Sequence, residues 1–101
     1  MAEFNAELTT NENGTAVVAV RGELDIQTVP QLEAVVAPAL EANPTRLVLD
    51  VSELRFADSS GIALWVRWAA QVDELELLRP SPLLRRVLTA MGLEQKLRMT
   101  P

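Results

Sequence analysis

The residues best suited to regulated chemistry are Asp58-Ser59-Ser60-Gly61. They follow an apolar, β-branched run at residues 47–51 and precede an apolar stretch with helical spacing at residues 62–72. This pattern predicts a strand, a short corner and a helix. A helix start holds free backbone N–H groups and a partial positive charge, and can tolerate a phosphate. The pattern makes Ser59 the candidate phosphoacceptor and Ser60 its rival.

The same corner also has a purely structural interpretation. An isolated Asp-Ser-Ser-Gly is more often a capped turn than a modified site. In this interpretation Asp58 caps the helix, and Gly61 allows another chain to approach the helix start closely.

Composition restricts the partners of this chain. The 101 residues fit one domain, and 49% hydrophobic with 23% charged residues is a globular balance. The net charge of −5 argues against binding to a phosphate backbone, so we expect no direct nucleic-acid partner. The N-terminus is acidic, and no apolar run approaches the ~20 residues of a membrane span. We therefore expect a cytoplasmic monomer that does not insert into membranes.

Metal chemistry is disfavoured by the residues available. The chain has no Cys and no His, which excludes disulfides and the usual zinc sites. Glu23, Asp25, Asp50 and Asp58 could suggest magnesium, but their spacing matches no metal-binding loop. We expect no metal and no cofactor.

Catalysis by a nucleophilic serine is a competing hypothesis. It would use Ser59 or Ser60, but the chain lacks a His base and a Gly-x-Ser-x-Gly elbow, and Lys96 is its only lysine. We therefore expect that the protein is not an enzyme.

Hydrophobic patterning predicts the element order β-β-α-β-α-β-α. Asn13-Gly14 is a hairpin signal between an alternating strand from Phe4 and a strand at residues 15–21, and a loop follows at residues 22–25. Alternating helices and strands after a hairpin predict an α/β fold with a mixed sheet.

Helix signals and further strands complete the pattern. Thr28 with Gln31 resembles a capping box, and Ser81-Pro82 predicts another helix start. The remaining expected strands are at residues 75–78 and, as a short edge strand, residues 97–99. The expected inner face of the last helix is formed by Leu84, Val87, Leu88 and Met91.

The two tryptophans fall on different flanks of the helix at residues 62–72. Trp65 joins the inner stripe, whereas Trp68 lies with Leu64 and Val72. The default interpretation is that this second flank packs in the core or against a neighbouring helix. The alternative is that it forms an exposed apolar patch that binds a partner. Arg85 and Arg86 are expected on the surface.

Three segments, in order, resemble anti-sigma factor antagonists, which are small proteins made of a STAS domain. They are Gly22-Glu23-Leu24-Asp25, residues 47–62 with the corner Phe56-Ala57-Asp58-Ser59-Ser60-Gly61-Ile62, and residues 80–93. The resemblance implies one STAS-type domain over residues 1–101. The chain differs from the usual pattern at Ala57, at Ile62-Ala63 and in its short segment at residues 70–74.

The resemblance also implies a partner-switching function. In that family, the serine after the corner Asp, here Ser59, is phosphorylated by a partner that is both serine kinase and anti-sigma factor. The free form binds that partner and releases a sigma factor, the phosphorylated form dissociates, and a serine phosphatase resets it. Asp25, Asp58, Ser60 and Gly61 are the expected partner-binding residues.

An unphosphorylated adaptor is the alternative within the same fold. STAS domains also serve in lipid-transport complexes and signalling assemblies, so the resemblance leaves this second function open.

Overall fold

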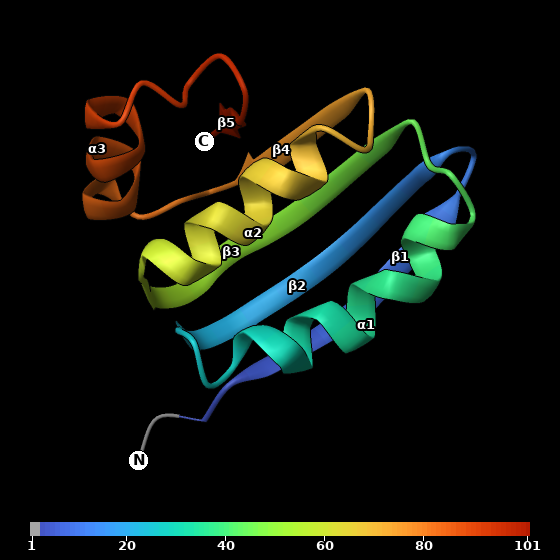
Figure 1. Ribbon diagram of the computed structural model, residues 1–101, viewed down its shortest axis with the longest axis horizontal. Coiled ribbons are helices and arrows are strands. Elements are labelled where there is room, and N and C mark those ends of the chain that lie inside the picture. The colour runs from blue at the N-terminus through green and yellow to red at the C-terminus, as the bar shows by residue number, and fades with distance from the viewer. Residues whose placement is uncertain (1–2) are drawn as a thin grey trace.

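A five-stranded mixed sheet organises the molecule (Figure 1). The computed structural model describes residues 3–101. The strands lie in chain order across the sheet; β1 and β2 are antiparallel, and the other neighbouring pairs are parallel. This confirms the predicted α/β class with its N-terminal hairpin. The elements are β1 (Asn5–Glu12), β2 (Thr15–Leu24), α1 (Val29–Glu41), β3 (Arg46–Ala57), α2 (Ser59–Ala69), β4 (Glu74–Leu78), α3 (Pro82–Ala90) and β5 (Arg98–Thr100).

The core lies between the sheet and two helices. Helix α1 packs on β1 and β2, and α2 packs on β3 and β4, so the two helices lie side by side over one face (Figure 1). Successive strand residues point to opposite faces, and one alternating set of residues in the central strands is fully buried. These strand residues are Ala16, Val18, Val20, Leu47, Leu49, Val51, Leu75 and Leu77. On the opposite face Val48 and Glu76 are buried as well.

Two strands extend further than their hydrophobic patterns predict. The expected strand at residues 47–51 continues to Ala57, and the expected loop at residues 22–25 is strand as far as Leu24. The added residues pair in parallel, with Leu24 beside Ala57. Backbone pairing continues there although polar residues interrupt the apolar run. The strand ends predicted from the apolar residues alone were therefore too early.

Gly22 is required for this extension. Its φ of +96° lies in the left-handed region, next to a register irregularity in the β2–β3 pairing. A Cβ at this position would lie 2.5 Å from the backbone oxygen of Glu3. Glycine meets both constraints because it has no side chain.

The second helix and the C-terminal strand are shifted from their predicted positions. Helix α2 spans Ser59–Ala69 rather than residues 62–72, because the corner serines are helical but add nothing to the apolar stripe. The edge strand is Arg98–Thr100 rather than residues 97–99, and it pairs in parallel with β4.

The hypothesis that Trp68 forms an exposed patch is wrong. Its side chain belongs to the core, together with Leu64, Trp65 and Val72. Helix α2 lies on the sheet and also contacts α1, so it is covered over a wider arc than one stripe.

Replacement of Trp68 tests this packing. Trp68→Ala is expected to lower the free energy of unfolding by about 3–5 kcal/mol, because it removes a large buried side chain. Urea unfolding followed by circular dichroism measures the effect. The control is Leu83→Ala, at a side chain that is 63% exposed, with an expected cost below about 1 kcal/mol. If both variants lowered the free energy of unfolding equally, the placement of Trp68 in the core would be contradicted.

Candidate functional site

The corner between β3 and α2 is built around the carboxylate of Asp58. The Asp58 N–H donates to the carbonyl of Leu24 at 3.0 Å, which joins the ends of the two extended strands. Asp58 then turns into the N-cap of α2, and its Oδ1 accepts the N–H groups of Ser60 at 2.9 Å and Gly61 at 3.2 Å. The predicted cap is therefore confirmed by the geometry of the corner.

The two corner serines differ in what their hydroxyls do. The Ser60 hydroxyl donates to Asp58 Oδ1 at 2.5 Å, and its residue is half-buried. Ser59 is exposed at the first position of α2, and its hydroxyl forms no hydrogen bond within residues 3–101. Of the two candidates, Ser59 presents the free oxygen.

Gly61 seals the corner against the end of β2. It is buried, and a Cβ there would lie 2.7 Å from both Cγ and Cδ2 of Leu24. Leu24 is itself fully buried, so it has little room to move. The close neighbour of Gly61 is thus Leu24 of the same chain, and the approach of another chain at this point stays a prediction.

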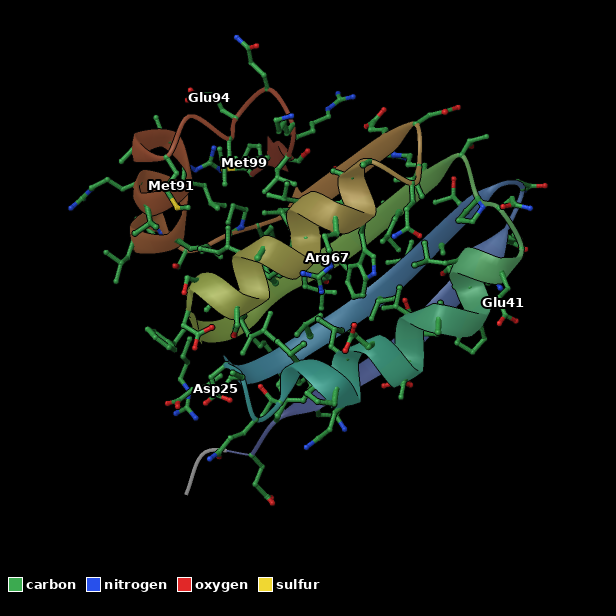
Figure 2. The ribbon with its side chains drawn as sticks, in the orientation of Figure 1. Asp25, Glu41, Arg67, Met91, Glu94 and Met99 are labelled. Carbon is green, nitrogen blue, oxygen red and sulfur yellow. The ribbon has the colours of Figure 1, made fainter. Side chains whose placement is uncertain are left out.

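The loop after β2 lies beside this corner. Asp25 directly follows Leu24, which pairs with Ala57, and Figure 2 shows it where β2 leads into α1. Its Oδ1 accepts the N–H groups of Gln27 at 2.9 Å and Thr28 at 3.1 Å. The carboxylate of Asp25 is thus turned toward its own loop.

The predicted capping box at the start of α1 is not formed. Thr28 is the N-cap residue, but its side chain makes no capping bond to the helix. Its hydroxyl instead accepts the Asp25 N–H and donates to the Glu23 carbonyl, each at 2.9 Å. The Thr28 N–H donates to the Asp25 carboxylate. In the predicted capping box, this N–H would have donated to the Gln31 side chain.

Hydrogen bonds keep the Asp58 carboxylate charged. The Ser60 hydroxyl is the main cause that lowers the pKa of Asp58; partial burial opposes it, and the N–H groups of Gly61, Ser60 and Ile26 lower it further. Because Asp58 already occupies the N–H groups of Ser60 and Gly61, these donors are not free for a phosphate on Ser59. Such a phosphate would instead lie next to an existing negative charge.

Exposed apolar side chains surround the corner, and the sequence analysis missed them. Ile26 is 74% exposed, Phe56 52% and Leu83 63%. A small hollow of about 100 Å³ separates the end of β3 from α3 and is lined by Leu54, Arg55, Phe56, Ala57, Ser81, Leu83, Leu84 and Val87.

The inner face predicted for the last helix is wrong in part. Leu84 and Leu88 are buried, but Val87 is 38% exposed and Met91 is 51% exposed. Leu83 and Val87 are four residues apart and so share a helix face, which was the available signal for this surface.

Within residues 3–101, no three His, Cys, Asp or Glu side chains converge as metal ligands. Asp50, one of the acids considered for magnesium, pairs with Arg79 at 2.9 Å. In the same part of the chain, no helix combines the length and apolarity needed to cross a bilayer.

Comparison with known families identifies the fold. Residues 8–100 match the family described as Mlab, STAS domain. The chain belongs to the STAS domain family. This membership agrees with the resemblance inferred from the corner and its flanking segments.

Individual STAS relatives carry more specific names. The anti-sigma F factor antagonist of Lysinibacillus sphaericus is 33% identical over 95 residues, covering 89% of this chain and 80% of its own. The crystal structure of an anti-sigma factor antagonist from Mycobacterium paratuberculosis has a TM-score of 0.86 at 24% identity, over 98% of this chain and 86% of that one; it supports the fold alone.

One structural relative is solved in two chemical states. The anti-sigma factor antagonist SpoIIAA in its unphosphorylated form is 30% identical, with a TM-score of 0.75 over 98% of this chain and 89% of its own. SpoIIAA of Bacillus in the phosphorylated form has a TM-score of 0.69 at the same identity, over 98% of this chain and 92% of its own.

The contact between Gly61 and Leu24 can be tested by a mutant cycle. Gly61→Ala is expected to lower the free energy of unfolding by about 1–3 kcal/mol, because the new methyl overlaps a buried side chain. In a Leu24→Ala background the same change should cost less, because the space is then open. Chemical unfolding of the four proteins measures the coupling. Strict additivity would mean that the two residues do not meet.

The Asp58 cap predicts a pH dependence of stability. Asp58→Ala is expected to cost about 1 kcal/mol near neutral pH. Since the folded-state pKa lies below the unfolded value, this contribution is present above about pH 4 and declines as pH falls further. Unfolding curves at several pH values measure the difference between wild type and variant.

The matched control is the other polar helix cap. The Ser81 hydroxyl accepts the Leu84 N–H at 3.1 Å and does not titrate in this range. The cost of Ser81→Ala should therefore stay constant while that of Asp58→Ala shrinks. A pH-independent cost at Asp58 would show that its charge does not contribute.

Proposed function

We propose that this chain is an anti-sigma factor antagonist, a regulatory binding protein and not an enzyme, switched by phosphorylation of Ser59. The observation that carries the proposal is the contrast between two neighbouring hydroxyls. Ser59 is exposed and unbonded within residues 3–101, whereas the Ser60 hydroxyl is held by Asp58. A kinase would find its acceptor oxygen at Ser59.

The relatives support both halves of this proposal. Several are named anti-sigma factor antagonists, and one of them is known in unphosphorylated and phosphorylated forms. This chain resembles both forms over 98% of its length, so the fold of that relative accommodates the modification. We further propose that residues 1–101 form one STAS domain that acts as a monomer in the cytoplasm.

The proposed switch is electrostatic. An anti-sigma factor with serine kinase activity transfers the γ-phosphoryl group of ATP to Ser59 Oγ. The bond from the γ-phosphorus to Oγ forms as its bond to the bridging oxygen breaks, ADP leaves, and the hydroxyl proton passes to a base of the kinase and then to solvent. The phosphate adds about −1.5 to −2 charge beside the Asp58 carboxylate and near the Asp25 loop. A partner surface that fits the free hydroxyl then meets extra bulk and charge, and the complex dissociates. A serine phosphatase hydrolyses the ester and restores the binding form.

The surface around Ser59 fits a protein partner. Asp25, Asp58 and Ser60 form the polar centre of the proposed contact, and the buried Gly61 shapes it from within. Ile26, Phe56 and Leu83 expose apolar area around it, which is typical of sites that bind other proteins. The apolar rim would supply affinity, while the centre would sense the phosphate.

Incubation with the cognate kinase and ATP, followed by intact-mass measurement, tests the acceptor. Wild type and Ser60→Ala are expected to gain one phosphoryl group, and Ser59→Ala none. Calorimetry should show that Ser59→Ala still binds the kinase, and that the phosphorylated protein binds it about a hundredfold more weakly, equivalent to ~3 kcal/mol.

Three results would contradict this switch. Phosphorylation that persists in Ser59→Ala would move the acceptor elsewhere. Equal affinity of the free and phosphorylated forms would leave the phosphate without a role in release. If the kinase binds but never modifies the chain, the unphosphorylated adaptor becomes the better description.

A further inference from the structure

The charges of this chain are unevenly distributed. Residues 79–101 contain five of the nine basic residues and only one of the 14 acidic residues, a net charge of +4. Residues 1–78 therefore carry −9. Such asymmetry within one small domain indicates that its C-terminal part meets a different partner chemistry from the rest.

Three of these basic residues line one open groove. The groove lies along α3 at the C-terminal end of the molecule, where Figure 1 shows α3 and the C-terminus near one another. Its volume is about 710 Å³, within the range of ligand-binding clefts. We call it the arginine groove; its main lining residues are Arg79, Arg85, Arg86, Pro80, Pro82 and Pro101.

Two of the three guanidinium groups are available to a ligand. Arg79 already pairs with Asp50 at 2.9 Å. Arg85 and Arg86 form no ion pair within residues 3–101. Their positive charges therefore lie beside the prolines without a compensating carboxylate from the described part of the chain.

Arg79 occupies a backbone conformation that glycine would adopt more easily. Its φ is +56°, in the left-handed region that non-glycine residues rarely adopt. Its N–H donates to the Thr100 carbonyl at 2.7 Å, and its side chain holds Asp50. These two contacts hold the guanidinium at the edge of the groove.

The arginine groove is separate from the hollow at the phosphoacceptor corner. Leu83, Leu84 and Val87 of α3 line the corner hollow, whereas Arg85 and Arg86 line the groove. Helix α3 thus presents an apolar side toward the end of β3 and a basic side toward the groove.

We propose that the arginine groove binds an acidic, extended segment of a partner protein. Carboxylates of the segment pair with Arg85 and Arg86, and its apolar residues lie on the proline walls. Arginine suits this role because its planar guanidinium can form two parallel hydrogen bonds to one carboxylate. A long polyanion is disfavoured, because it would run past the basic groove onto a surface with net charge −9.

Fluorescence anisotropy with a labelled peptide of alternating Glu and Val tests the proposal on the full chain. The acidic peptide is expected to bind, more weakly as salt increases, and a Lys-Val peptide is not. Arg85→Glu/Arg86→Glu should lose about tenfold or more in affinity, because two attractions become repulsions. Arg85→Gln/Arg86→Gln provides a second, milder variant if charge reversal lowers the melting temperature.

The matched control is an exposed arginine on another helix. Arg67 lies on α2, away from α3 (Figure 2), and only approaches Glu33 at 3.9 Å. Arg67→Glu reverses one exposed charge, half the charge change of the double variant, and should bind the acidic peptide like wild type. Ser59→Glu should also bind normally, which separates this surface from the phosphorylation switch.

Several results would overturn the proposal. The proposal is contradicted if the acidic and basic peptides bind equally well, or if both double variants bind the acidic peptide as tightly as wild type does. It is also contradicted if Arg67→Glu loses as much affinity for this peptide as the double variants do. Tighter binding of phosphatidylglycerol vesicles or single-stranded RNA than of the acidic peptide would assign the groove to a different ligand.

Discussion

The corner depends on one carboxylate oxygen. Oδ1 of Asp58 accepts the backbone N–H groups of Ser60 and Gly61 and the hydroxyl of Ser60. These bonds start α2 at Ser59 and leave Ser59 as the serine with a free hydroxyl. They also lower the pKa of Asp58, with the Ser60 hydroxyl as the main cause, so a fixed negative charge lies beside the candidate acceptor. The hydrogen bonds to Asp58 Oδ1 therefore determine where α2 begins, which serine keeps a free hydroxyl, and where a negative charge lies beside it.

The sheet provides the platform on which this carboxylate can act. Parallel pairing carries β2 and β3 to a common end, where the Asp58 N–H reaches the Leu24 carbonyl and Gly61 packs against the Leu24 side chain. The loop that starts with Asp25 is thereby brought beside residues more than 30 positions later in the chain. A substituent at Gly61, or a shorter β2, would separate the two halves of the site.

Helix α3 gives the domain two different surfaces. Its buried side, with Leu84 and Leu88, attaches it to the core. Leu83 and Val87 extend the apolar rim around the corner, while Arg85 and Arg86 line the basic groove. The proposed switch at Ser59 and the proposed recognition of an acidic segment therefore depend on different residues of α3 and can be altered independently.

Local patterns in the sequence were enough to predict the α/β class, the hairpin at Asn13-Gly14 and the Asp58 cap. These depend on residue type and short spacing, which are properties of the chain itself. The phosphoacceptor role of Ser59 rests on the resemblance of longer segments and stays a prediction. The tertiary structure decided the rest: the full length of β3, the burial of Trp68, the contact of Gly61 with Leu24, the exposure of Val87 and the gathering of three arginines. Each of these depends on which distant segment covers a residue, and the periodicity of one segment carries no information about its neighbours in space.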